Sequence, residues 1–177
     1  MIVLGIDPGT QHTGYGVVEV ARRQETALAY GVIDLPDGMD HALRLERIYE
    51  QIVDVIERWQ PDECAVEMPV FAKNAQSMLK LGRAQAAVML AAVHRQLPVT
   101  QYTPKEVKKA VTGNGNAAKE QVWYMVQRLL SISEDKGLDA SDALAVALCH
   151  AHRTEQGPTG KFKDWKSFVA ANPGRVR

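Results

Sequence analysis

Four acidic residues stand where apolar segments end or begin, positions at which a carboxylate has no evident packing role. Asp7 ends an apolar run at the N-terminus, and Glu67 ends a second short apolar run. Asp139 and Asp142 are three residues apart, so they face the same side of a helix. Carboxylates held together repel one another, and burial strengthens the repulsion. Mg²⁺ or Mn²⁺ with oxygen ligands relieves it, and a pair of such ions catalyses phosphodiester hydrolysis.

Each acid alone also has a structural explanation. Asp7 precedes Pro-Gly and fits an Asx-type turn, while Glu67 fits the exposed end of a strand. Asp139 fits an N-cap, and Asp142 fits an acid in the first turn of a helix. The metal interpretation therefore depends on a fold that brings the four acids together.

Hydrophobic periodicity and turn residues predict the elements that position these acids. Thr103 and Glu106 form a capping-box pattern around Pro104, and Asn116 is expected to cap the helix that follows a glycine-rich loop. The expected elements are strands over residues 2–6, 15–20 and 26–33, a helix over 45–59, a strand over 63–67, a helix over 74–96, a strand over 99–102, a helix from 103, and helices over 116–130 and 139–152.

This order predicts an α/β fold with a five-stranded mixed sheet and helices on both faces. The first three strands form an antiparallel meander, and helical crossovers add the other two in parallel. Such a sheet brings the ends of the first and fourth strands close to the last helix. Residues 1–152 are expected to form one domain, and residues 153–177, which contain Gly, Pro and Lys, a flexible basic tail.

Composition indicates an ordinary globular protein. The chain has 177 residues, of which 46% are hydrophobic and 24% charged, enough for one domain with a sizeable core. Cys64 and Cys149 lie in apolar contexts and are expected to be reduced core thiols. No apolar run is long enough for a membrane span, so we expect a cytoplasmic protein with no membrane association.

The formal net charge of zero conceals two opposed halves. Residues 1–67 hold 5 Lys or Arg against 13 Asp or Glu, and residues 68–177 hold 16 against 8. This asymmetry is typical of a basic face that meets a polyanion, although a set of solvated helix faces would give the same count.

Six motifs in one order carry a family resemblance. They are Gly5-Ile6-Asp7-Pro8-Gly9-Thr10, Thr13-Gly14-Tyr15-Gly16, Ala65-Val66-Glu67, Ala72-Lys73-Asn74-Ala75, Leu79-Lys80-Leu81-Gly82 and Asp139-Ala140-Ser141-Asp142-Ala143-Leu144-Ala145. Together they closely resemble the RuvC family of bacterial crossover junction endodeoxyribonucleases, over residues 2 to about 152.

The resemblance implies an RNase H-like fold and a homodimer that resolves four-way (Holliday) DNA junctions by paired symmetric nicks, in homologous recombination and DNA repair. It implies catalysis by Asp7, Glu67, Asp139 and Asp142 with two Mg²⁺ or Mn²⁺ ions per active site. Asp7 would bridge both ions, Glu67 would serve one, and Asp142 with Asp139 the other. Water would be the nucleophile, leaving a 5′-phosphate and a 3′-hydroxyl. The branch-migration proteins RuvA and RuvB are the implied partners.

DNA contacts are expected from a set of basic and polar residues after Glu67. Relatives place an aromatic wedge at the position of Val70, and here Phe71 follows one residue later, where a core Phe is the alternative. Asn74 equally fits a plain helix cap. The expected DNA-binding residues are Phe71, Lys73, Asn74, Lys80, Arg83, Lys105, Lys108, Lys109 and Lys119.

The helix over residues 84–93 is apolar almost all round, although covering one sheet face needs a single apolar stripe. The second stripe packs on a neighbouring helix or forms a dimer contact, and the resemblance favours a dimer. The expected interface residues are Ala84, Val88, Met89 and Ala92.

Three other functions fit parts of the sequence. An actin-like or sugar-kinase-like domain shares the first motif but requires a second such domain, for which the chain is too short. A RuvC-like nuclease acting on structured RNA fits less well, because Lys80-Leu81-Gly82 and the Asp139/Asp142 pair match RuvC. A non-catalytic junction-binding protein would not need all four acids.

Overall fold

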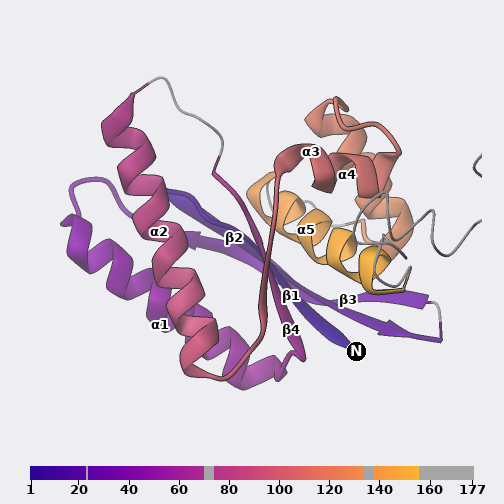
Figure 1. Ribbon diagram of the computed structural model, residues 1–177, viewed down its shortest axis with the longest axis horizontal. Coiled ribbons are helices and arrows are strands. Elements are labelled where there is room, and N and C mark those ends of the chain that lie inside the picture. Colours follow the sequence, from indigo (N-terminus) through magenta and orange to yellow (C-terminus); the bar gives the residue numbers. More distant parts are fainter. Residues whose placement is uncertain (23, 70–73, 134–137, 156–177) are drawn as a thin grey trace, which may run out of the picture.

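A computed structural model describes residues 1–22, 24–69, 74–133 and 138–155 (Figure 1). Each expected strand and helix is present. In chain order they are β1 (Ile2–Asp7), β2 (His12–Ala21), β3 (Gln24–Asp34), α1 (His41–Trp59), β4 (Glu63–Glu67), α2 (Ala75–His94), β5 (Val99–Tyr102), α3 (Pro104–Thr112), α4 (Lys119–Leu130) and α5 (Leu138–Glu155).

The sheet has the predicted mixed topology, with strand order β3-β2-β1-β4-β5. Strands β1, β2 and β3 pair antiparallel, while β4 pairs parallel with both β1 and β5. Because β1 and β4 are adjacent and parallel, their carboxyl ends meet at one edge of the sheet. Asp7 and Glu67 are the last residues of these two strands.

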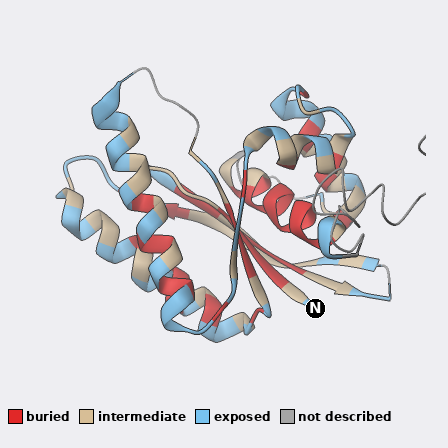
Figure 2. Ribbon diagram, viewed as in Figure 1, coloured by how far each residue is buried: buried red, intermediate tan, exposed pale blue. Residues whose placement is uncertain are grey.

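Helices cover both faces of the sheet, as expected. Figure 1 shows α1 and α2 on one face and α3, α4 and α5 on the other. Alternate residues of β1 face the two layers, so Leu4 and Ile6 enter the core under α1 and α2, and Val3 enters the core under α5. In Figure 2 the buried residues follow the central strands and almost the whole length of α5.

Two helix starts differ by more than one residue from the sequence-based expectation. Helix α1 begins at His41, four residues early, because the side chain of Asp40 accepts a hydrogen bond from the backbone N–H of Ala42. The prediction that Asn116 caps α4 is wrong. The helix begins at Lys119, and the side chain of Gln121 reaches back to accept from the backbone N–H of Ala118.

Other local predictions are confirmed. Thr103 and Glu106 form the expected capping box at the start of α3. Cys64 and Cys149 are buried free thiols. Helix α5 continues to Glu155, three residues beyond its expected end, and residues 156–177 of the predicted tail lie outside the described part of the chain.

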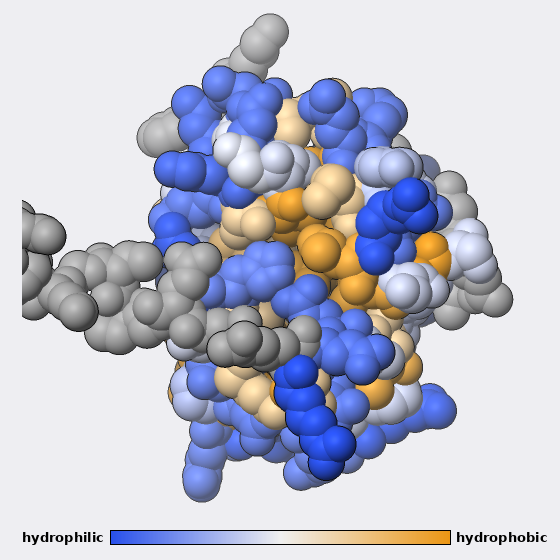
Figure 3. Space-filling view, turned by 90° about the vertical axis from the view of Figure 1, so that its right-hand side faces the viewer, coloured by the Kyte–Doolittle hydropathy of each residue, from blue (hydrophilic) through white to orange (hydrophobic). Residues whose placement is uncertain are grey.

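Figure 3 shows the side of the molecule at the right of Figure 1. Apolar side chains gather near the centre of this face, and hydrophilic ones surround them.

Among the described residues, no helix combines the length and the hydropathy that crossing a bilayer requires.

Candidate active site

The two strand acids lie side by side because of the register between β1 and β4. Ile6 pairs with Val66, so the next residue of each strand, Asp7 or Glu67, projects from the same edge. Both acids are partly buried. The sequence-based expectation that these strand ends meet is confirmed.

Glycines allow α5 to approach the sheet closely enough to bring its two acids to this edge. A Cβ atom on Gly5 would lie 2.2 Å from the backbone oxygen of Ala143, and one on Gly14 would lie 2.0 Å from that of Asp139. No side chain tolerates contacts this short, so the approach requires glycine at both positions. The first turn of α5 therefore rests directly on β1 and β2.

Asp7, Asp139 and Asp142 form a triad that could hold a metal ion. Each offers one carboxylate oxygen, and these oxygens lie within 4.8 Å of one another. Burial, followed by the charges of Asp142 and Asp139, raises the pKa of Asp7 to about 6. The triad is thus crowded enough to disfavour full ionisation when no cation is present.

Glu67 lies next to this triad. Burial is the main reason that its pKa rises to about 8, and the charges of Asp7 and Asp142 raise it further. The fold therefore brings together all four acids that the sequence singles out.

Lys119, the first residue of α4, contacts the triad. Its Nζ donates a hydrogen bond to Asp142 Oδ2 at 2.8 Å, and this bond raises the pKa of the lysine. Lys108 on α3 is less directly involved, since it lowers the pKa of Glu67 through charge. Both lysines were expected at the DNA, and the structure places both beside the acids.

The turn after Asp7 depends on two residues whose roles the sequence did not predict. Buried Thr13 exchanges hydrogen bonds with the backbone of Gly9, at 3.2 and 3.3 Å. Arg44 donates to three backbone oxygens, including that of Thr10 at 2.8 Å. Thr13 lies in the Thr13-Gly14-Tyr15-Gly16 motif, whereas nothing in the sequence distinguishes Arg44 from other arginines on helix surfaces.

The other predicted DNA-binding residues are more dispersed. Lys105 and Lys109 are exposed on α3, Arg83 is exposed on α2, and Asn74 is exposed just before α2. Asn74 is also the N-cap of α2, since its side chain accepts from Gln76 N at 2.9 Å.

Lys80 lies apart from the α3 lysines, at a polar cavity of about 520 Å³ that Thr10, His41 and Arg44 also line. It is therefore close to the turn that follows Asp7. Phe71 and Lys73 lie outside the described residues.

Three of the four predicted dimer residues face the interior of the subunit. Ala84, Val88 and Ala92 are at most 1% exposed, because their stripe of α2 packs into the core that α1 and the sheet share. Assigning them to a subunit interface was therefore wrong, while Met89 is partly exposed. The large apolar side chains that α2 exposes are Leu79, Leu90 and Val93.

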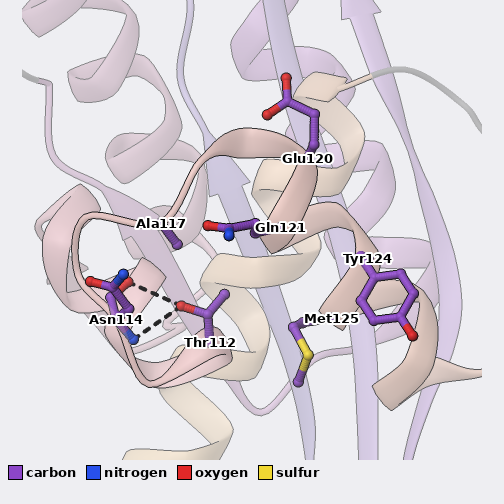
Figure 4. A pocket seen from close by; sticks show the side chains of 7 residues that line it. All are labelled: Thr112, Asn114, Ala117, Glu120, Gln121, Tyr124 and Met125. Carbon is purple, nitrogen blue, oxygen red and sulfur yellow. Dashed lines mark hydrogen bonds between the residues drawn. The ribbon is translucent and has the colours of Figure 1, made fainter.

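A separate hollow of about 430 Å³ lies between the end of α3 and the outer face of α4 (Figure 4). Ala117, Tyr124 and Met125 contribute to its lining, and Thr112 and Asn114 close one side through hydrogen bonds. Among the described residues that line it, Glu120 is the one charged residue. A hollow without a basic lining residue, and without any of the four acids, is not part of the acidic site.

Known proteins resemble the chain over most of its length. The family model described as crossover junction endodeoxyribonuclease RuvC matches residues 3–150. The RuvC of Salinibacter ruber is 55% identical over 177 residues, which cover 99% of each chain. The RuvC of Pelobacter propionicus is 51% identical over 152 residues, covering 86% of each chain.

Solved structures agree with this match. Thermus thermophilus RuvC is 37% identical, with a TM-score of 0.81 over 89% of this chain and 97% of that one. The structure of T. thermophilus RuvC in complex with Holliday junction substrate has a TM-score of 0.83 over 89% of this chain and 96% of that one. The yeast mitochondrial Holliday junction resolvase Ydc2, at 12% identity, has a TM-score of 0.61 over 85% and 78%, and shares the fold. The predicted RNase H-like fold is confirmed.

Proposed function

This chain belongs to the RuvC family of crossover junction endodeoxyribonucleases, and we propose that it resolves four-way (Holliday) DNA junctions by paired symmetric hydrolytic nicks. The observation that carries the proposal is the meeting of four carboxylates at one edge of the sheet. A junction-binding protein without catalytic activity would gain nothing from this crowding.

The donor set fits hard divalent cations. It consists of carboxylate oxygens alone, and their crowding raises the pKa of Asp7 and of Glu67. We propose two Mg²⁺ or Mn²⁺ ions per active site, with Asp7 serving both, Glu67 one, and Asp142 together with Asp139 the other. Such ions, when bound, activate water and stabilise the leaving oxygen of the phosphodiester.

The chain itself holds and orients the reactants. Strands β1 and β4 and the first turn of α5 fix the acids on rigid elements, so that the ligand oxygens need little reorganisation. Water is the nucleophile, because the four acids serve as ligands. The products are a 5′-phosphate and a 3′-hydroxyl, which a ligase can rejoin.

Basic side chains around the acids supply the DNA surface. We propose that Lys108 and Lys119 contact the phosphates nearest the site, and that exposed Lys105 and Lys109 extend this surface along α3. We propose that Lys80, which lines the cavity beside the turn after Asp7, contacts the DNA backbone there. Asn74, Arg83, Phe71 and Lys73 complete the proposed contacts.

Paired nicks require two active sites, which favours a homodimer. Leu79 and Leu90 are eleven residues apart, about three helical turns, so they lie on the same side of α2. Both are more than half exposed, as is Val93. We propose that these residues, with Met89, form the isologous contact, and that the dimer works with RuvA and RuvB in the bacterial cytoplasm.

Cleavage assays on a labelled four-way junction, a linear duplex and a structured RNA test the proposal directly. Wild-type protein with Mg²⁺ or Mn²⁺ should make symmetric nicks in the junction alone, and chelation should abolish them. Asp7→Asn should still bind the junction but not cut it. Cleavage by Asp7→Asn, or equal cleavage of the RNA, would contradict the assignment.

A further inference from the structure

Among the basic residues that the structure describes, Lys119 makes a direct contact with the acidic site. Its Nζ lies 2.8 Å from Asp142 Oδ2, and Asp142 is one of the three acids whose oxygens gather within 4.8 Å. The lysine side chain is 54% exposed, whereas that of Asp142 is 18% exposed. A long and half-exposed side chain thus places its charge at an inward-facing carboxylate.

This ammonium group acts on all four acids. Apart from the bond to Asp142, its charge interacts with Asp7 and Asp139, and it favours the ionised form of Glu67. Of the other lysines in the described part of the chain, Lys108 affects Glu67. Lys119 is therefore placed as a general counter-charge for the cluster.

An ammonium group at this position competes with the divalent ions of the proposed function. Both need the oxygens of Asp142, and both are cations, so they cannot occupy the cluster together without strong repulsion. The lysine can withdraw at little cost, because a half-exposed ion pair is weak and the side chain is flexible.

We propose that Lys119 is a built-in counter-cation of the metal-free site, which the divalent ions must displace from Asp142 before the site becomes active. The inference rests on the proposed metal site and extends it. It gives Lys119 two successive partners, the carboxylate in the resting protein and a DNA phosphate once ions fill the cluster. Junction DNA would then assist ion binding by offering the displaced ammonium a new anion.

Titration of the DNA-free protein with Mn²⁺ by calorimetry tests the displacement, with no need for turnover. Lys119→Gln and Lys119→Met remove the competing charge, and each should bind Mn²⁺ more tightly than wild type, by up to about five-fold. Lys119→Arg keeps the cation and should stay close to wild type. Arg128→Gln, on the exposed face of the same helix, makes the same change in net charge and should leave the affinity unchanged.

Equal or weaker Mn²⁺ binding by both neutral variants, with wild-type circular dichroism, would overturn the inference. An equal increase in Mn²⁺ affinity in Arg128→Gln would also overturn the inference, since net charge alone would then explain the effect. Asp7→Asn separates this result from the proposed function. If that variant keeps full Mn²⁺ affinity, the metal site itself is wrong. If it loses affinity while the Lys119 variants match wild type, only the counter-cation role fails.

Discussion

Gly14→Ala changes the position of an acid without altering any acid. Gly14 lies on β2 beneath the first turn of α5 and pairs with Asp7 in the β1–β2 register. A Cβ atom there would lie 2.0 Å from the backbone oxygen of Asp139 and 2.6 Å from its carbonyl carbon. Both contacts are to backbone, so no side-chain rotation relieves them.

The size of the effect follows from these distances. Real Cβ contacts stay beyond 3.0 Å, so the first turn of α5 must withdraw by about 1 Å. Metal-ligand distances tolerate only about 0.2 Å, and a misplacement of about 1 Å in an active site costs on the order of 10²-fold in rate. Overpacking also costs about 1–3 kcal/mol of unfolding free energy, which lowers Tm by roughly 5 °C in a chain of this size.

Junction cleavage, Mn²⁺ affinity and thermal unfolding should be measured on this variant beside Gly31→Ala. A Cβ atom on Gly31 would lie 2.9 Å from the hydroxyl of Tyr15, and its three nearest atoms all belong to this side chain, which can shift. Both variants should lose some stability. Gly14→Ala alone should lose Mn²⁺ affinity and about 10²-fold in cleavage rate.

Equal cleavage rates and Mn²⁺ affinities in the two variants would refute the reasoning. The close approach of α5 would then not be what positions Asp139. A Gly14→Ala protein that is inactive but binds Mn²⁺ normally would also count against it, because displacement of an acid must weaken the ion site.

Three further predictions concern charge and anchoring. The pKa of Asp7 rises from 3.8 in the unfolded chain to about 6 in the metal-free fold, and the pKa of Glu67 rises from 4.5 to about 8. Between these values the folded protein holds protons that the unfolded protein has released. Thermal unfolding in the presence of a chelator should therefore show a free energy of unfolding that falls as the pH rises from about 4 to about 8. Asp7 alone accounts for about 3 kcal/mol of this loss, and saturating Mn²⁺ should remove it. Lys108→Gln should weaken junction binding and flatten its salt dependence in anisotropy titrations, and an unchanged slope would remove this lysine from the DNA surface. Arg44→Met should lower unfolding free energy by about 2 kcal/mol and reduce cleavage, because the turn after Asp7 loses a charged donor; an unchanged melting curve would contradict this.

One pattern in the sequence predicts both the sheet and the acidic cluster. Asp7 and Glu67 each end a strand that is apolar on both faces, and such strands belong at the centre of a sheet. Once the crossovers make β1 and β4 parallel, the two acids must share an edge. The long apolar run after Asp142 likewise predicts a buried helix, whose first turn then lies beside them.

The sequence was insufficient where several choices have similar local energies. An all-round apolar helix does not show which stripe meets the sheet, and for this reason Ala84, Val88 and Ala92 were placed at a dimer contact although they face the core. Asn116 and Ala118 are both possible N-caps of α4. Ala118 takes this position because its backbone N–H donates a hydrogen bond to the side chain of Gln121. Arg44 acts on backbone oxygens, which carry no sequence signature.

The energetics of the cluster explain why its supporting helix is so deeply buried. Acids whose pKa is raised by burial and mutual repulsion destabilise the metal-free fold at neutral pH, so apolar packing has to offset them. Leu144 and Leu148 of α5 are fully buried, and burial of such side chains contributes about 1.5–3 kcal/mol each. This packing anchors the helix that carries two of the four acids against their repulsion. A protein that must present an empty acidic site to its metal needs this anchoring before the metal arrives.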